Sequence, residues 1–169
     1  PAPPHPPPHD RRRTPGASAM PPKTATRIHT ADPASPLNPA PASAAITAGR
    51  TDIGALVSFT GLCRDEDGRL AALELEHYPG MAEAEIARIA KEAASRWPLQ
   101  ALTVVHRHGR VAPGEVIVVV AAASTHRHAA FEAAAFVMDF LKTRAPFWKK
   151  EHGRDGSSGG WVEARSADD

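Results

Sequence analysis

The chain has 169 residues, and 42% of them are hydrophobic, a share that can fill the core of one domain. Its formal net charge of +1 gives no general attraction for nucleic acid, and its single cysteine excludes an internal disulfide and a metal site built from several cysteines. No apolar run approaches the roughly 20 residues of a membrane-spanning helix, and the N-terminus lacks the apolar core of a secretory signal. We therefore expect a soluble protein of the cytoplasm.

Proline dominates the N-terminal segment. Most of the 17 prolines precede Ser43, and such a segment buries too little apolar surface to offset the entropy lost on ordering. We interpret residues 1–23 as a disordered extension and residues 24–169 as a single domain. The three arginines at positions 11–13 are a short basic run of the kind that is usually solvated.

The first elements of the domain are short. A polar, β-branched run over residues 24–30 predicts an edge strand. After a proline-punctuated loop, Ser43 offers an N-cap for a short helix over residues 44–50.

Two longer strands follow. Residues 53–60 are almost continuously apolar, which predicts a strand covered on both faces, and residues 70–78 alternate as in a strand with one wetter face. An Asp-Gly turn at positions 67 and 68 separates them, so we expect a long hairpin. Arg64 then falls at a strand end, where a side chain can project into a site.

The remaining elements alternate between helices and strands. Helices are indicated by one apolar face, and strands by continuous apolar runs. We predict a helix, two strands, a helix and a strand over residues 81–97, 102–108, 115–123, 126–145 and 160–165. This order predicts an α+β domain with helices packed on a mostly antiparallel sheet. The sequence has no glycine-rich phosphate loop, which disfavours nucleotide hydrolysis and dinucleotide chemistry.

A proline ends the last helix beside several lysines. Pro146 lacks an N–H and clashes with the preceding turn, and Phe147 and Trp148 follow it as apolar anchors. Lys142 and Lys149 flank this break. A lysine beside buried aromatic surface has its charged form disfavoured, which suits proton transfer or nucleophilic chemistry near neutral pH. The alternative is a solvated helix end whose lysines interact with the helix dipole.

Two arginines are candidates for an anion site. Arg127 falls at the start of the long helix, where unpaired N–H groups and the helix dipole attract anions. Together with Arg64 it would hold a phosphate or carboxylate, whereas the alternative is that both are ordinary surface arginines.

The histidines and the cysteine give weaker candidates. A metal site is conceivable at His106, His108, His126 and His128, because alternate strand residues point the same way. No Glu-x-x-His or cysteine partner completes a ligand set, so we expect no metal. Cys63 is a conceivable nucleophile, but a lone cysteine at the end of an apolar strand is more often a small buried hydrophobe.

Six blocks of sequence follow one another in the order of a known family. They are FTGLCR at 59–64, LEHYPGM at 75–81, HRHG at 106–109 with PG at 113–114, THR at 125–127 with AFE at 130–132, LKTRAPFWKKE at 141–151 and WVEAR at 161–165. With these blocks the chain resembles the large, catalytic subunits of molybdopterin synthase, the enzyme of molybdenum-cofactor biosynthesis. The resemblance implies the α/β-hammerhead-like fold of those subunits.

The resemblance implies sulfur transfer. Large subunits of this family form a homodimer, and each binds a small ubiquitin-like sulfur carrier to give a heterotetramer. The carrier's C-terminal Gly-Gly tail ends in a thiocarboxylate. Two sulfurs delivered in succession convert cyclic pyranopterin monophosphate into the dithiolene of molybdopterin. No cofactor, metal, nucleic acid or membrane is implied.

The same resemblance assigns residues to this chemistry. Lys142 and Lys149 match the catalytic lysines, and the residues implied to bind substrate are Arg64, His126, Arg127, Lys150 and Arg165. Part of the pocket is lent by the other protomer, so activity would need the dimer. A negative tail and a negative phosphate repel each other unless cations stand between them. We hypothesise that Lys149 is the general acid/base or thiocarboxylate partner and that Lys142 orients and neutralises the tail.

Two other functions stay open at this point. The chain could be a non-catalytic module that captures the carrier's C-terminal tail in a cationic pocket. It could also be a phosphate-dependent metal enzyme built on the histidines, which would hold tightly bound zinc or iron.

Overall fold

The computed structural model describes residues 23–30, 32 and 34–163. Its elements, in chain order, are β1 (Lys23–Thr30), α1 (Pro39–Thr47), β2 (Ala55–Leu62), β3 (Leu70–His77), α2 (Met81–Arg96), β4 (Leu99–Val111), β5 (Val116–Ser124), α3 (Arg127–Thr143), β6 (Phe147–Gly153) and β7 (Val162–Glu163). The predicted extension, apart from Lys23 at its end, and the candidate residue Arg165 lie outside the described residues. The division into extension and domain therefore stays a prediction.

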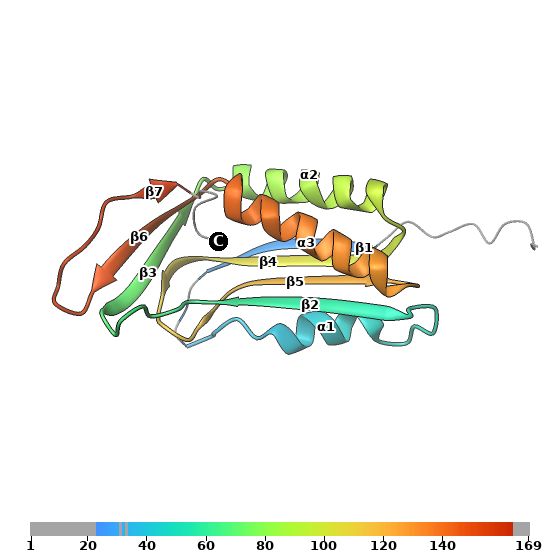
Figure 1. Ribbon diagram of the computed structural model, residues 1–169, viewed down its shortest axis with the longest axis horizontal. Coiled ribbons are helices and arrows are strands. Elements are labelled where there is room, and N and C mark those ends of the chain that lie inside the picture. The colour runs from blue at the N-terminus through green and yellow to red at the C-terminus, as the bar shows by residue number, and fades with distance from the viewer. Residues whose placement is uncertain (1–22, 31, 33, 164–169) are drawn as a thin grey trace, which may run out of the picture.

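The strands form one mostly antiparallel sheet, which confirms the predicted α+β class. The strand order is β2-β5-β4-β3-β6-β7, and within the described residues only β1 pairs in parallel, with β4. β1 thus lies at an edge, as predicted. In Figure 1 β3, β6 and β7 extend to the left of the other strands, and we call these three strands the wing.

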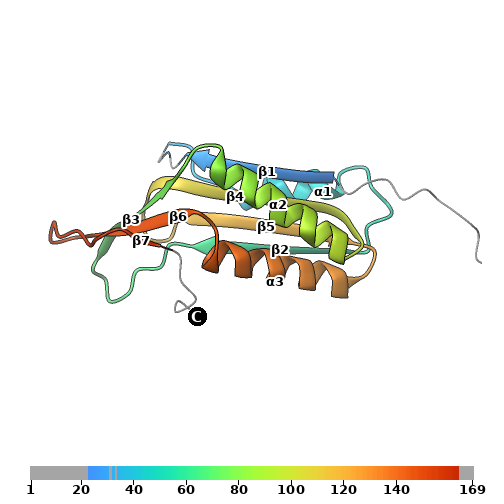
Figure 2. The same cartoon turned by 90° about the horizontal axis from the view of Figure 1, so that it is seen from above.

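Helices cover both faces of the sheet (Figures 1 and 2). α2 and α3 lie on one face, where Leu102, Val104 and Val120 belong to the largest core and are fully buried. α1 covers the opposite face, where Ile46 packs with Ala121. Both faces of β5 are therefore buried, which explains its continuously apolar sequence.

The predicted hairpin between the first two long strands is wrong. β2 pairs with β5, whereas β3 pairs with β4 and β6. The chain does not turn back after β2, because the β4–β5 turn holds it. The Cys63 N–H donates to the Glu115 carbonyl at 2.8 Å, and the Gly114 N–H donates to the Cys63 carbonyl at 2.7 Å. The segment after β2 is thereby directed toward the wing.

Other boundaries differ from prediction for local reasons. α1 begins at Pro39 instead of after Ser43, because the Asn38 side chain accepts a hydrogen bond from the Ala40 N–H at 3.0 Å and proline is favoured in a first helical turn. β6 is a strand that the sequence pattern does not predict, and β7 begins at Val162, two residues after the predicted start of the last strand. α2 and α3 end within two residues of their predicted limits.

Candidate functional site

β6 places Lys149 on the inner face of the wing. Successive strand residues point to opposite faces, so Phe147 and Lys149 share one face while Lys150 points to the other. Phe147 is buried in the main core, which identifies its face as the inner one. Directly across from Lys149 lies Leu75 of β3, which packs with Cys63. Lys149 is half-buried here.

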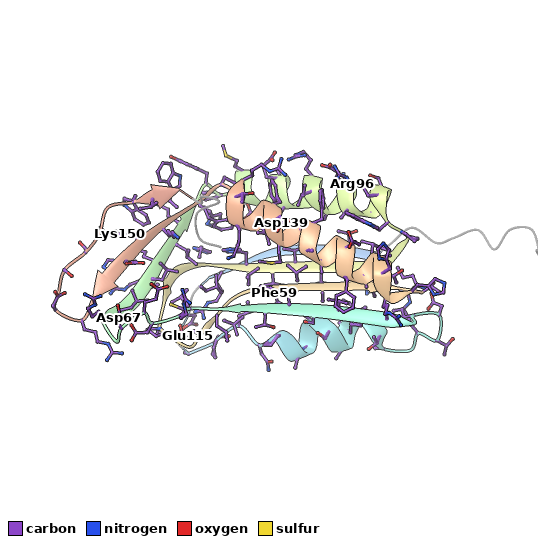
Figure 3. All side chains as sticks on the ribbon, viewed as in Figure 1. Phe59, Asp67, Arg96, Glu115, Asp139 and Lys150 are labelled. Atoms are coloured by element: carbon purple, nitrogen blue, oxygen red, sulfur yellow. The ribbon has the colours of Figure 1, made fainter. Side chains whose placement is uncertain are left out.

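Lys150 lies on the outer face of the wing (Figure 3). Its Nζ lies 5.6 Å from the centroid of the Trp161 ring, within the range of a cation–π interaction. On the same face His152 Nε2 and Glu74 Oε2 form a hydrogen bond of 2.6 Å. Lys150 and Lys149 therefore do not share a face, and a substrate contact of Lys150 stays a prediction.

The end of α3 brings Lys142 to the wing end of the molecule, the end at which β3, β6 and β7 extend beyond the other strands. α3 ends at Thr143 and β6 begins at Phe147, so a short link joins Lys142 to the strand that carries Lys149 (Figure 1). The Lys142 side chain is exposed. Within the single chain it is thus not held in buried apolar surface, in contrast to the expectation. Because Lys142 lies in the last turn, its positive charge interacts favourably with the helix dipole, as the alternative interpretation proposed.

Arg64 projects from the segment after β2. Its side chain is 80% exposed and forms an ion pair with Glu66. The segment beneath it is anchored by Asp65, which accepts hydrogen bonds from the Leu70 N–H at 2.9 Å and from Arg154 at 3.1 Å. Arg64 is therefore presented to solvent on a fixed support at the wing end.

Glu66 is a site residue that the sequence pattern does not reveal. It follows Arg64 by two positions in an irregular segment, where side chains have no periodicity that predicts a contact. The ion pair means that an anion at Arg64 competes with the Glu66 carboxylate.

His126 and Arg127 lie at the opposite end of β2. Ala55, the first residue of β2, pairs with Ser124, which directly precedes the turn into α3. The eight residues of β2 span about 23 Å, and Arg64 lies beyond their far end. The predicted anion site shared by Arg64 and Arg127 is therefore not formed within one chain. Sequence order alone gave no measure of this separation.

A close backbone approach fixes the start of α3. The Gly54 N–H donates to the Ser124 carbonyl at 3.1 Å, and a Cβ at Gly54 would lie 2.1 Å from the Thr125 carbonyl oxygen. His126 is the N-cap, with extended backbone and no capping hydrogen bond from its ring. The exposed His126 and Arg127 side chains are thus available to a ligand at a helix N-terminus.

Cys63 and the histidines do not form the alternative sites. Cys63 is buried, and this burial raises the pKa of its thiol, which disfavours the nucleophilic thiolate. In the described part of the chain no group of three or more His, Cys, Asp or Glu side chains could hold a metal ion. Every helix in that part is too short or too polar to span a bilayer.

A buried histidine anchors the start of β6. The rings of His106 and Phe147 stack with centroids 3.9 Å apart, and His106 Nδ1 lies 2.7 Å from the Arg107 carbonyl. A carbonyl only accepts, so Nδ1 carries a proton. Burial lowers the pKa of His106 to about 4, with smaller contributions from the nearby His77 and His108. His106 thus holds Phe147, two residues before Lys149.

We expect the buried His106 to make folding sensitive to acid. As pH falls below the ordinary histidine pKa, the unfolded chain binds a proton that the folded chain excludes until about pH 4, so the free energy of unfolding decreases. Between pH 7 and pH 5 the loss is about 2 kcal/mol. Denaturant unfolding of wild type and of His106→Phe, which keeps an aromatic ring without titration, measures it. An equal pH dependence in both proteins contradicts the assignment.

Comparisons with known proteins agree on one family. The family model described as "MoaE protein" matches residues 33–144. A relative from Mesorhizobium japonicum, named "Molybdopterin synthase catalytic subunit", is 74% identical over 125 residues, which are 74% of this chain and 79% of the relative. The solved molybdopterin biosynthesis MoaE protein of Burkholderia ambifaria has a TM-score of 0.72 and 47% identity, with 86% of this chain and 93% of that one covered.

A more distant structure shows the same fold. It comes from Helicobacter pylori, with a TM-score of 0.63, 19% identity, and coverage of 85% of this chain and 90% of that one. That protein is described as part of a complex of subunits 1 and 2 of molybdopterin-converting factor.

Proposed function

Since this chain belongs to the MoaE protein family, we propose that it transfers sulfur from the thiocarboxylated C-terminus of a small carrier subunit to cyclic pyranopterin monophosphate. The chain is a catalytic subunit of molybdopterin synthase, an enzyme of molybdenum-cofactor biosynthesis. Delivery of two sulfurs in succession, which forms the dithiolene of molybdopterin, is the finer part of the proposal.

One observation carries the proposal: three cationic side chains, Arg64, Lys142 and Lys149, belong to elements that meet at the wing end. A thiocarboxylate and a phosphate are both negative, and bringing them together is unfavourable in a partly dry site unless cations lie between them. Leu75 and Cys63 give Lys149 an apolar neighbourhood that strengthens such interactions. The arrangement therefore suits two anionic reactants.

Each cation has a proposed role. Lys149 acts as the general acid/base when the sulfur bonds to a substrate carbon, so that the oxygen leaving that carbon is protonated. Alternatively, Lys149 pairs with the thiocarboxylate. Lys142 orients and neutralises the carrier tail. Water then cleaves the bond between the glycine carbonyl and sulfur, which returns the tail as a carboxylate and leaves sulfur on the pterin. Arg64 holds the phosphate together with His126 and Arg127 of a second copy, because one chain separates these groups.

The proposed assembly is a homodimer that binds one carrier at each end. The described complex of the Helicobacter pylori protein supports a two-subunit enzyme. Contacts of Lys150 and Arg165 with substrate, and a cytoplasmic location, stay predictions from the sequence.

A single-turnover assay tests the function directly. The purified chain, a carrier bearing a C-terminal thiocarboxylate and cyclic pyranopterin monophosphate are mixed, and sulfur in the pterin product is measured. We expect transfer from the thiocarboxylate and none from a carrier that ends in an ordinary carboxylate. Tight carrier binding without transfer would instead identify the chain as a tail-binding module.

A further inference from the structure

A loop that follows β6 holds residues 63–69, which connect β2 to β3 and which we call the Arg64 segment. Arg154, the first residue after β6, makes three contacts there. Its backbone N–H donates to the Arg69 carbonyl at 2.9 Å, and its Nη2 donates to Asp65 at 3.1 Å. Its Nε donates to the carbonyl of Leu70, the first residue of β3, at 3.3 Å. In Figure 1 the loop after β6 accordingly lies beside the start of β3.

The loop that carries Arg154 is folded back on itself. The Gly153 N–H donates to the Ser157 carbonyl at 2.8 Å, and the Gly156 N–H donates to the Gly153 carbonyl at 3.2 Å. A Cβ at Gly153 would lie 2.5 Å from the Ser157 hydroxyl oxygen and 2.6 Å from an Asp155 carboxylate oxygen, so the loop closes this tightly only around a glycine. Arg154 therefore projects from a defined support.

The Arg64 segment is acidic for a region that is proposed to hold a phosphate. Its three carboxylates and two arginines give it a formal charge of −1, and Figure 3 shows one of the carboxylates, Asp67. Each carboxylate forms an ion pair with a different arginine. The pairs are Arg64 with Glu66, Arg69 with Asp67 at 2.8 Å, and Arg154 with Asp65 at 3.1 Å. Arg154 thus supplies, from another loop, the charge that balances the segment.

Stability does not account for the ion pair of Arg154. The Arg154 side chain is 63% exposed, and ion pairs of exposed side chains contribute little to the free energy of unfolding. Asp65, however, directly follows Arg64 in the chain. An unpaired carboxylate at Asp65 would repel an anion bound by Arg64 and would itself compete for the Arg64 guanidinium.

We propose that Arg154 is a positioning residue for phosphate binding: it neutralises Asp65 and fixes the Arg64 segment, so that Arg64 can hold the substrate's phosphate. This role rests on the proposed function, in which Arg64 binds that phosphate. Arg154 acts through Asp65 and does not itself contact the substrate. The loop after β6 thereby connects the strand of Lys149 to the segment of Arg64.

Binding of cyclic pyranopterin monophosphate, measured by equilibrium dialysis without carrier, tests this role. Arg154→Ala should weaken binding about tenfold, an ordinary size for the coupling of neighbouring charged groups. The matched control is Arg88→Ala on α2, which removes an arginine of similar exposure from an ion pair of the same 3.1 Å length and should bind as the wild type does. Equal affinity of Arg154→Ala and wild type overturns the proposal.

A double-mutant cycle tests whether Arg154 acts through Asp65. Asp65→Asn removes the charge but keeps an oxygen that can accept from the Leu70 N–H. In this background Arg154→Ala should change the affinity by less than about twofold, because the carboxylate that it neutralises is gone. The same tenfold loss in both backgrounds would mean that Arg154 binds the substrate directly, which contradicts a positioning role.

Two further measurements separate positioning from general damage and from the proposed function. The carrier concentration for half-maximal sulfur transfer should be unchanged in Arg154→Ala, whereas a tenfold rise would contradict a role confined to the phosphate. In the free protein the Leu70 N–H, which Asp65 accepts, should lose protection against hydrogen exchange in Arg154→Ala but not in Arg88→Ala. Unchanged protection overturns the link between the loops. Lost protection in a chain whose wild type binds no pterin would support that link and reject the proposed function.

Discussion

A mixture of two inactive variants, Arg64→Ala and Arg127→Ala, is expected to recover about a quarter of the wild-type sulfur-transfer activity, since a symmetric dimer has two shared sites. Each variant alone should lose about 100-fold or more, because each removes a cation that holds and positions the substrate's phosphate in both sites of the dimer. The recovery requires no new contact. It follows from which copy supplies which arginine.

The expected fraction follows from counting sites. Random exchange of subunits makes about half of the dimers mixed, and each mixed dimer has one site with both arginines and one with neither. The complete site uses Arg64 from the Arg127→Ala copy and Arg127 from the Arg64→Ala copy. Because β2 separates these residues by about 23 Å in one chain, the complete site cannot form from a single copy.

A second mixture is the matched control. Arg64 and Lys149 lie at the same end of one chain, so mixing Arg64→Ala with Lys149→Ala leaves every site incomplete. We expect no recovery from that pair. Initial rates are measured after subunit exchange at equal total protein. Recovery in the control mixture, or its absence in the first mixture, would show that the arginines are not divided between copies as inferred.

The sequence predicts well what depends on local pattern. The apolar face of α2 and the unbroken apolar run of β5 follow directly from burial on one face or on two. The predicted ends of both elements lie within a few residues of the observed ends. Pro146 likewise marks the link after α3. These features need only the 3.6-residue and two-residue periodicities of side chains.

What the sequence does not predict depends on partners remote in the chain. Phe147 to Gly153 lacks a strand pattern, and it becomes β6 because β3 offers it a ladder from Leu70 to His77. β2 was expected to pair with its neighbour in sequence, but two backbone hydrogen bonds at Cys63 direct the chain to the wing. The same long-range order sets Arg64 and Arg127 apart. Residue types identified candidates for the site, whereas strand order decides which candidates can meet.

Replacing Lys149 with alanine is expected to slow sulfur transfer by about 100-fold to 10,000-fold, the range typical of a lost proton-transfer group. Lys149 is half-buried on the inner face of the wing, opposite Leu75, so water replaces its ammonium poorly. Lys142 is exposed at the end of α3, and its proposed task is to hold the carrier tail. Lys142→Ala should therefore raise the carrier concentration needed for half-maximal rate more than it lowers the maximal rate.

Single-turnover rates measured over a range of carrier concentrations separate the two effects. Lys91→Ala, which removes an exposed lysine from α2, is the matched control and should retain the wild-type rate. Both site variants keep the fold, because neither side chain belongs to a buried core. If Lys149→Ala and Lys142→Ala both turned over near the wild-type rate, neither amine would take part in the chemistry, and the cations at the wing end would serve carrier binding alone.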